Sequence, residues 1–369
     1  MERRCAFHLE PEKGWMNDPN GLCFFNGRYH VFYQHNPDSL LWKAPLRWGH
    51  AVSDDLVSFT HNNTALLPDM PYENDGGCFS GSAIEKGGRL YLFYTSVSKE
   101  LGQTQSVAYS DDGITFDKYE GNPIIPKSPL GDNTDFRDPK VFEYNGHYYM
   151  VCGAAIGNCG KVLLFRSDNL FDWEFVNSIY ENTHSSGVSE CPEMFYLDGR
   201  WVLMFSAVER KSPCVLFVIG DFDGERFINC KESFCEYGTD FYAPQTFLDN
   251  RGRRIMIGWL YNDDRPNAAD SSSASSGVLS IPRELHIRND RITNYPVEEA
   301  HRFFDTDCEC ADIIGSIISI DCGDSGEYRF DLSCISGFRG IEKLDLLCDK
   351  KLVEIFINGG EISLSRLLC

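Results

Sequence analysis

A turn dipeptide that returns at regular intervals restricts the fold more than any other feature of this sequence. Asn-Gly or Asp-Gly between apolar, β-branched or aromatic runs is the strongest short-range signal of a β-hairpin. These turns are Asn26-Gly27, Asn145-Gly146 and Asp198-Gly199, with weaker copies at Gly87-Gly88 and Asn250-Arg251-Gly252. The turn glycines at positions 27, 88, 146, 199 and 252 are spaced by 61, 58, 53 and 53 residues. This spacing predicts five copies of one β-rich unit.

A second element recurs between the hairpins. It is a short polar turn followed by an aromatic residue, at Ser53-Asp54-Asp55, Ser110-Asp111-Asp112, Ser167-Asp168-Asn169 and, more loosely, Asp221-Phe222-Asp223. Each unit therefore holds two hairpins, or about four strands, which is the unit of a propeller blade. The sequence predicts an all-β fold with a five-bladed β-propeller over residues 1–295.

The chain changes character after residue 300. Its apolar or alternating segments there are short, at 314–320, 328–332, 344–347 and 353–357. They predict a small β-sandwich-like domain over residues 300–369, near the lower size limit for a self-sufficient core. We expect it to pack on the propeller or on a second copy of itself, so a homodimer through this domain is one hypothesis.

The net charge of −21 restricts the partners. It argues against nucleic acid and anionic membranes, both of which attract basic proteins. No apolar run approaches the roughly eighteen residues of a membrane span. The composition fits a protein that binds a small neutral molecule.

The cysteines and histidines show no metal-binding pattern. There are 15 cysteines without a Cys-x-x-Cys pair, and the nine histidines lack paired ligand spacing. Free thiols in a reducing compartment are the expected state. Because no apolar leader precedes Trp15, we expect a cytoplasmic protein.

Each repeat also carries a polar residue at what looks like a corresponding place, just before its first strand. These residues are Asp18, Ser80, Asp138, Glu190 and Tyr242. A propeller would gather them in one ring at one end of its channel, with three carboxylates among them. Clustered acids raise one another's pKa values, which is uncommon without a chemical use. Turn capping alone would explain one of these carboxylates better than all three.

Three motifs carry a family resemblance. They are Trp15–Gly21 (Trp-Met-Asn-Asp-Pro-Asn-Gly), Arg137-Asp138-Pro139 and Glu190-Cys191-Pro192. With them the chain resembles the β-fructofuranosidases of glycoside hydrolase family thirty-two, which include invertase, sucrose-6-phosphate hydrolase and the fructan hydrolases. Further matching segments are Gln34, 79–82, 242–245, 282–285 and 354–358. The resemblance covers essentially the whole chain and implies a five-bladed propeller followed by a β-sandwich, which looks abbreviated here.

The resemblance also implies a chemistry. Asp18 would be the nucleophile, Glu190 the general acid and then the base, and Asp138 the residue that holds fructose hydroxyls and stabilises the oxocarbenium-like transition state. This is the retaining route, which places the two working carboxyl groups about 5–5.5 Å apart. The implied sugar contacts are Trp15, Asn17, Gln34, Trp42, Phe79, Ser80, Arg137, Tyr242 and Trp259. No metal or organic cofactor is implied.

Several functional alternatives stay open. The substrate could be sucrose, sucrose 6-phosphate or a short fructo-oligosaccharide, and the same fructosyl-enzyme could pass its sugar to another sugar instead of water. A sugar-binding propeller without catalysis would be expected to lack at least one of the three carboxylates. A phosphorylated substrate would need a cation at the mouth, and the candidates are Lys43, Arg47, Lys99, Arg210 and Lys211.

Overall fold

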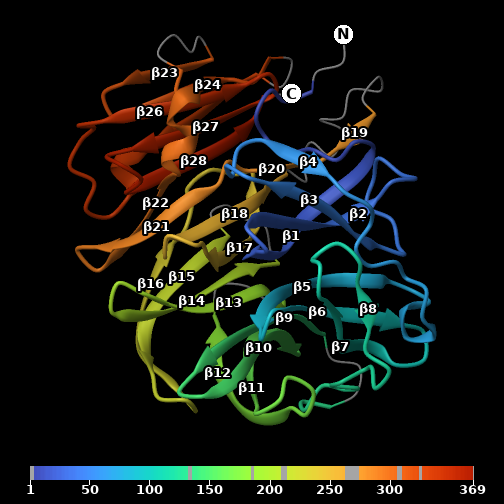
Figure 1. Cartoon of the computed structure of the whole chain (residues 1–369). Coiled ribbons are helices and arrows are strands. Elements are labelled where there is room, and N and C mark those ends of the chain that lie inside the picture. Colours follow the sequence, from blue (N-terminus) through green and yellow to red (C-terminus); the bar gives the residue numbers. More distant parts are fainter. Residues whose placement is uncertain are drawn as a thin grey trace.

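In the part of the chain that the structure describes, the strands form seven antiparallel sheets, with one short parallel addition. The computed structural model describes residues 4–131, 135–183, 187–208, 214–261, 274–305, 310–323 and 326–368. Five sheets form the part of the chain coloured from blue to orange, and two smaller ones, dark orange to red, lie together at one end (Figure 1). The prediction of a five-bladed β-propeller followed by a small β-sandwich is confirmed.

Four of the five blades contain four consecutive strands, ordered outward from the channel. The first contains β1 (Gly14–Phe25), β2 (Arg28–Asn36), β3 (Arg47–Ser53) and β4 (Phe59–His61). The second contains β5 (Gly77–Lys86), β6 (Arg89–Ser98), β7 (Gly102–Ser110) and β8 (Asp117–Lys118). The third contains β9 (Phe136–Tyr144), β10 (His147–Ile156), β11 (Cys159–Ser167) and β12 (Glu174–Asn182). The fourth contains β13 (Ser189–Leu197), β14 (Arg200–Ala207), β15 (Val215–Phe222) and β16 (Phe227–Phe234).

The fifth blade differs because a long segment interrupts it. It contains β17 (Phe241–Leu248), β18 (Arg254–Leu260), β21 (Arg283–Arg288) and β22 (Arg291–Pro296), and the short β20 (Val278–Leu279) also pairs with β18. Immediately before β20, β19 (Ser275–Ser276) pairs in parallel with β1. The segment that carries β19 and β20 therefore joins the last blade to the first and closes the ring.

The predicted turns have the expected geometry. Asn26 and Gly27 have φ values of 48° and 80°, and Asn145 and Gly146 have 51° and 79°, as a two-residue hairpin turn of this type requires. The second repeated element is a turn in which one carboxylate oxygen accepts two backbone N–H bonds. Asp55 Oδ1 accepts them from Val57 and Ser58 at 3.0 and 2.7 Å. The repeated turns therefore connect successive strands within a blade.

Side chains bind neighbouring innermost strands to one another. Ser82 on β5 donates to the carbonyl of Pro139 on β9 at 2.8 Å. Glu193 Oε2 on β13 accepts the backbone N–H of Thr246 on β17 at 2.9 Å and the ammonium of Lys140 on β9 at 2.9 Å. These buried bonds connect neighbouring blades near the channel.

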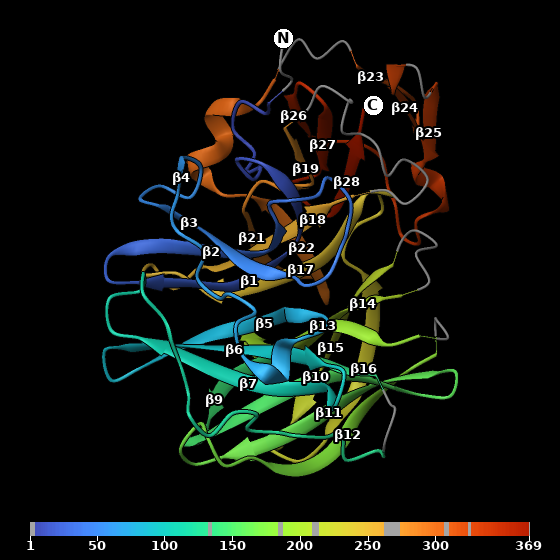
Figure 2. The same cartoon turned by 90° about the vertical axis from the view of Figure 1, so that its right-hand side faces the viewer.

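The C-terminal domain is two three-stranded sheets packed face to face. Its strands are β23 (Ala311–Ile314), β24 (Ile317–Asp321), β25 (Glu327–Asp331), β26 (Leu344–Asp349), β27 (Leu352–Ile357) and β28 (Ile362–Leu367). Strand β27 alternates between two cores: Val353 and Ile355 pack inside the sandwich, whereas Leu352 and Phe356 join the propeller core. The sheet of β26–β28 accordingly lies next to β18 and β22 (Figure 2). The division into residues 1–295 and 300–369 stays a prediction.

A buried ionic network crosses this boundary. The Arg283 guanidinium binds Glu236 at 2.6 Å and Glu354 at 2.5 Å. His8 bonds to Asp349 through Nδ1 at 3.0 Å and to Glu354 through Nε2 at 2.9 Å. Burial acts to lower the pKa of His8, but its hydrogen bonds to the two carboxylates outweigh that effect and raise the pKa to about 9. The motif residues Arg283 and Glu354 thus join the two parts of the molecule.

The helical segments that the structure describes are short 3-10 turns. They are η1 (Pro71–Glu73), η2 (Glu298–Phe303) and η4 (Leu332–Cys334). Within the described ranges, no helix has the length and apolar character needed to cross a bilayer.

Most described cysteines are free. Twelve of them carry free thiols, and burial raises the pKa values of Cys78 and Cys152 well above the usual range. Cys348 is disulfide-bonded instead. The expectation of free thiols is therefore met at twelve positions and is wrong at Cys348.

Candidate active site

A cavity of about 450 Å³ lies where the five innermost strands begin. All twelve site residues predicted from the sequence line it: Trp15, Asn17, Asp18, Gln34, Trp42, Phe79, Ser80, Arg137, Asp138, Glu190, Tyr242 and Trp259. Leu46, Gln103 and Tyr261 line it as well and were not predicted. Alternate residues of an extended segment share a face, so Tyr261 lies on the same face as Trp259 and could have been predicted from the sequence. Leu46 and Gln103 had no such signal in the sequence.

Bulges in the innermost strands aim the polar side chains into this cavity. Pairing with the second strand of each blade slips at 16–19, 78–81, 137–140, 190–193 and 242–245, and in the first blade it slips again at 20–23. A bulge of this kind bends the strand and redirects a side chain, and bulges concentrate beside active sites. Asp138 at the third bulge has a φ of 64°, a left-handed conformation that is strained for a residue other than glycine.

The sequence prediction placed the five polar residues in one slot before the strands, and the structure corrects it in two respects. All five lie inside the strands, and they occupy different positions of the bulge. Glu190 and Tyr242 are the last paired residues before it, Asp138 is the first bulged residue, and Asp18 and Ser80 are the second. The side chains converge because each bulge bends its own strand, which residue spacing alone does not reveal.

Asp18 is half-buried and held by donors from two other blades. Ser80 Oγ donates to its Oδ2 at 2.7 Å, and the thiol of Cys191 approaches the same oxygen at 3.6 Å. Donors of this kind stabilise a charged carboxylate. The arrangement suits a nucleophile, which has to be ionised to attack.

Asp138 is the most deeply buried of the three carboxyl groups, with 4% of its surface exposed. Its Oδ2 accepts the backbone N–H of Cys191 at 2.8 Å. Burial raises the pKa of Asp138 to about 7, and the charges of Glu190 and Asp18 act in the same direction, against the lowering effect of Arg137. This is the behaviour expected of carboxyl groups held together in one site.

Glu190 is oriented through both of its oxygens. Arg137 donates to Oε1 from Nε at 3.1 Å and from Nη2 at 2.8 Å, and the Tyr242 hydroxyl donates to Oε2. Arg137 is itself held by Asp135, which accepts from Nη1 at 2.8 Å. The carboxyl group therefore has one defined position above the cavity.

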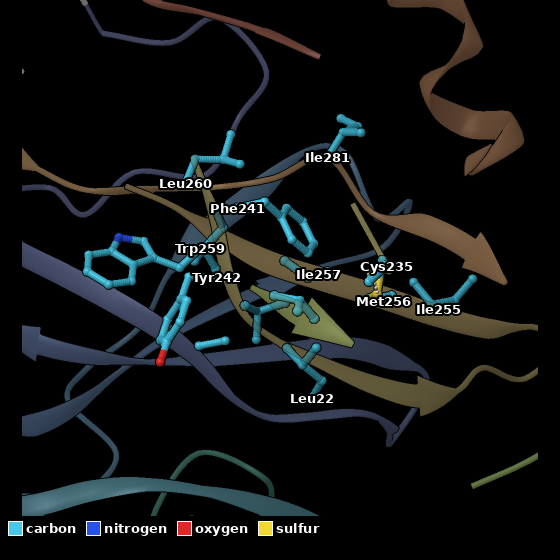
Figure 3. Close-up of a cluster of buried hydrophobic side chains, with 14 of the residues drawn as sticks. Leu22, Cys235, Phe241, Tyr242, Ile255, Met256, Ile257, Trp259, Leu260 and Ile281 are labelled. Atoms are coloured by element: carbon cyan, nitrogen blue, oxygen red, sulfur yellow. Dashed lines mark hydrogen bonds between the residues drawn. The ribbon is translucent and has the colours of Figure 1, made fainter. Parts of the chain in front are cut away.

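Aromatic rings form the wall of the cavity. The Trp259 ring stacks on Tyr261 at 4.2 Å and meets Trp15 edge-on at 5.6 Å. Tyr242 and Trp259 lie on one side of a buried apolar cluster, with the Tyr242 hydroxyl directed away from it (Figure 3). Trp42, by contrast, is 52% exposed, so it belongs to the rim and not to the core. Such rings can stack on the apolar face of a sugar.

Gln34 offers an unused acceptor. Its side chain is 1% exposed, and its Nε2 donates to the carbonyl of Cys78 at 2.9 Å. Its Oε1 is buried and has no partner among the residues that the structure describes. Buried polar atoms are rarely left unpaired, so this oxygen indicates a place for a ligand hydroxyl.

The cavity offers few positive charges. Among the described residues that line it, Arg137 is the one cation. Lys43, Arg47 and Lys99 do not line it, and Arg210 and Lys211 lie outside the described residues.

One side-chain group elsewhere has a spacing compatible with a metal ion. Cys5, His8 and Asp349 place their ligand atoms within 4.8 Å of one another. However, both ring nitrogens of His8 already bond to carboxylates. A metal ligand needs a free nitrogen lone pair, so the group fits an ion pair better than a metal site.

The comparisons with known proteins agree with this geometry. Residues 8–296 match the family model for the N-terminal domain of glycosyl hydrolases family 32. The chain belongs to this family. Raffinose invertase of Escherichia coli is 32% identical over 97% of this chain and 88% of its own length. Sucrose-6-phosphate hydrolase of Zymomonas mobilis is 37% identical over 80% of this chain and 62% of its own, so that match spans less than two thirds of the relative.

Solved structures of the family have the same architecture. A β-fructofuranosidase of Bombyx mori, solved as a mutant in complex with sucrose, is 30% identical with a TM-score of 0.82, over 99% of this chain and 89% of that one. Fructan 1-exohydrolase IIa of Cichorium intybus has a TM-score of 0.83 at 21% identity, which supports the fold alone. The predicted family, and fructosyl-releasing hydrolysis as its activity, are confirmed.

The raised pKa of Asp138 predicts a pH-dependent stability. The folded state holds a proton that the unfolded carboxyl, with its pKa near 3.8, has already released. Unfolding therefore becomes easier as the pH rises from about 4 to about 7. We expect Asp138→Asn to be more stable than the wild type at pH 8, by at most about 4 kcal/mol, and to lose that advantage near pH 4. Urea unfolding of both proteins at pH 8 and pH 4.5 measures this difference, and an equal difference at both pH values would contradict the prediction.

Proposed function

We propose that this chain is an exo-acting, retaining β-fructosidase that hydrolyses sucrose or short fructo-oligosaccharides. The observation that carries the proposal is the convergence of Asp18, Asp138 and Glu190, from three blades, on one aromatic-walled cavity. Each has separate support: Ser80 on Asp18, a backbone N–H on Asp138, and Arg137 with Tyr242 on Glu190. A sugar-binding protein without catalysis would not need this set.

The first chemical step forms a fructosyl-enzyme. Asp18 attacks the anomeric carbon of the fructosyl unit while Glu190 protonates the departing glycosidic oxygen. Asp138 holds fructose hydroxyls and stabilises the positive charge that develops on the ring. Arg137 bonds to Oε1 of Glu190 and the Tyr242 hydroxyl to Oε2, so both residues orient the carboxyl group that delivers the proton.

The second step releases fructose. Glu190, now ionised, takes a proton from water, and the resulting nucleophile attacks the anomeric carbon and displaces Asp18. A sugar hydroxyl in place of water would give fructosyl transfer through the same intermediate. Product analysis at high sucrose concentration measures the proportion of transfer.

An uncharged substrate is favoured by the lining of the cavity. A phosphate group is usually met by Lys or Arg side chains, and Arg137, which is committed to Glu190, is the one cation among the described lining residues. The relatives carry names of both kinds, raffinose invertase and sucrose-6-phosphate hydrolase. We therefore rank sucrose and 1-kestose above sucrose 6-phosphate.

The test compares four substrates under one set of conditions. Fructose release from sucrose, sucrose 6-phosphate, 1-kestose and inulin is measured for the wild type and for Glu190→Ala. Release by the wild type with loss in the variant supports the proposal, and the order of kcat/KM values identifies the substrate. A wild type that is inert on all four would contradict it.

Two further proposals concern the setting of the enzyme. The twelve free thiols support a reducing cytoplasm, although the disulfide at Cys348 does not. The exposed sheet of β23–β25, where Ile314 is 73% exposed, supports a homodimer through the C-terminal domain. Sedimentation at micromolar concentration tests the dimer, and a mass of 41.9 kDa would rule it out.

A further inference from the structure

Gln103 lines the cavity but has no part in the mechanism above. It lies at the start of β7, the third strand of its blade counted outward from the channel. The three carboxylates come from the innermost strands, so Gln103 lies farther from the channel axis than they do. Like the exposed Trp42, it belongs to the rim of the cavity, where the part of a substrate beyond the fructosyl unit has to lie.

The oxygen of the Gln103 amide is bonded to residues that the structure describes, whereas its nitrogen is not bonded to any of them. Its Oε1 accepts the backbone N–H of Phe136 at 2.8 Å and Nη1 of Arg137 at 3.4 Å. These bonds fix the carbonyl end and turn the amide nitrogen away from both donors. No described residue accepts a hydrogen bond from that nitrogen, and the side chain is only half-buried. The two N–H groups are therefore open to a ligand in the cavity.

Arg137 places this amide next to the general acid. Its guanidinium binds Glu190 through Nε and Nη2 and Gln103 through Nη1. Asp18, the nucleophile, has its contacts with Ser80 and Cys191 instead. In a retaining enzyme the acid meets the oxygen of the departing group, on the side opposite the nucleophile. The Arg137 guanidinium therefore lies between Gln103 and the acid, and Gln103 is on the side of the departing sugar.

We propose that Gln103 is a specificity-determining residue that donates a hydrogen bond to a hydroxyl of the leaving sugar. The inference rests on the proposed function, because it takes Glu190 as the acid. The same contact would serve an acceptor sugar during fructosyl transfer, because the acceptor sugar enters the site that the leaving sugar has vacated. An aryl leaving group carries no sugar hydroxyl and gains nothing from it.

Two variants separate the role of the N–H groups of the Gln103 amide from the role of its oxygen. Gln103→Glu keeps an oxygen for Phe136 and Arg137 but removes the N–H donors, whereas Gln103→Leu removes both. Each is assayed with sucrose and with 4-nitrophenyl β-D-fructofuranoside, and thermal unfolding checks the fold. The new charge of Gln103→Glu disturbs the acid, which sucrose needs and the aryl substrate does not. The ratio of the two kcat/KM values is therefore also measured for Gln103→Leu, which adds no charge and should lower it as well.

We expect Gln103→Glu to lower the sucrose-to-aryl ratio of kcat/KM by about 3- to 10-fold, the effect of one lost hydrogen bond. Transfer products at high sucrose concentration should fall as well. An unchanged ratio in Gln103→Glu would overturn the proposal and leave Gln103 as a support for Phe136 and Arg137. A wild type inert on both substrates would instead overturn the proposed function, and this inference with it.

Discussion

Replacing Glu190 by alanine is expected to lower kcat for sucrose by roughly 10²–10⁴-fold. Glucose is a poor leaving group unless the glycosidic oxygen is protonated. Glu190 is the carboxyl group that Arg137 and Tyr242 hold at the cavity. With 4-nitrophenyl β-D-fructofuranoside the first step should fall far less, because a nitrophenolate leaves without a proton. The measurement is the pre-steady-state release of nitrophenol beside the steady-state release of fructose.

The same variant should accumulate the fructosyl-enzyme. Its second step lacks the base that activates water, so a burst of nitrophenol should be followed by slow turnover, and added azide should restore the rate. Glu174→Gln is the matched control, since Glu174 lies on β12 with a side chain that is 82% exposed. Equal losses with sucrose and the aryl substrate, without a burst or azide rescue, would mean that Glu190 is not the acid.

Replacing Asp18 by asparagine is expected to abolish turnover of both substrates, with a loss on the order of 10⁵-fold or more. Without a carboxylate at this position there is no nucleophile, and a better leaving group cannot compensate. Mass spectrometry of acid-quenched enzyme should find one fructosyl unit attached to Glu190→Ala and none attached to the Asp18→Asn, Glu190→Ala double variant. Peptide mapping should locate that unit on Asp18.

Two companion variants sharpen this prediction. Ser80→Ala removes one hydrogen bond from Asp18 and should lower kcat by about tenfold, far less than loss of the carboxylate. Asp54→Asn, on an exposed carboxylate paired with Arg28, should leave the activity unchanged. A fructosyl unit that still attaches to the double variant would show that another residue is the nucleophile.

The propeller was predictable because its signals are local. A turn such as Asn26-Gly27 has its geometry dictated by two residues and their φ values, and the regular return of that turn sets the number of blades. That the proposed site residues line one cavity was predictable for a related reason. The motifs around Asp18, Asp138 and Glu190 are contiguous in sequence, and the family resemblance assigns each of them a role.

The tertiary structure decided everything that depends on neighbours from another blade. The pKa of Asp138 is raised because burial and the charges of Glu190 and Asp18 act on it together. Gln103 has no motif, and its importance follows from Arg137, which lies in the next blade.

The same division explains the corrected prediction and the unassigned motifs. The single slot expected for five polar residues became three positions of a bulge, because a bulge is a property of strand pairing and not of residue spacing. Arg283 and Glu354 were recognised without a role, and only packing identified them as the buried pair that joins the propeller to the C-terminal domain. Sequence by itself determined the repeat and the motifs that line the cavity, since both depend on short stretches of chain. Their positions, partners and protonation depend on contacts across tens to hundreds of residues, which only the folded chain brings together.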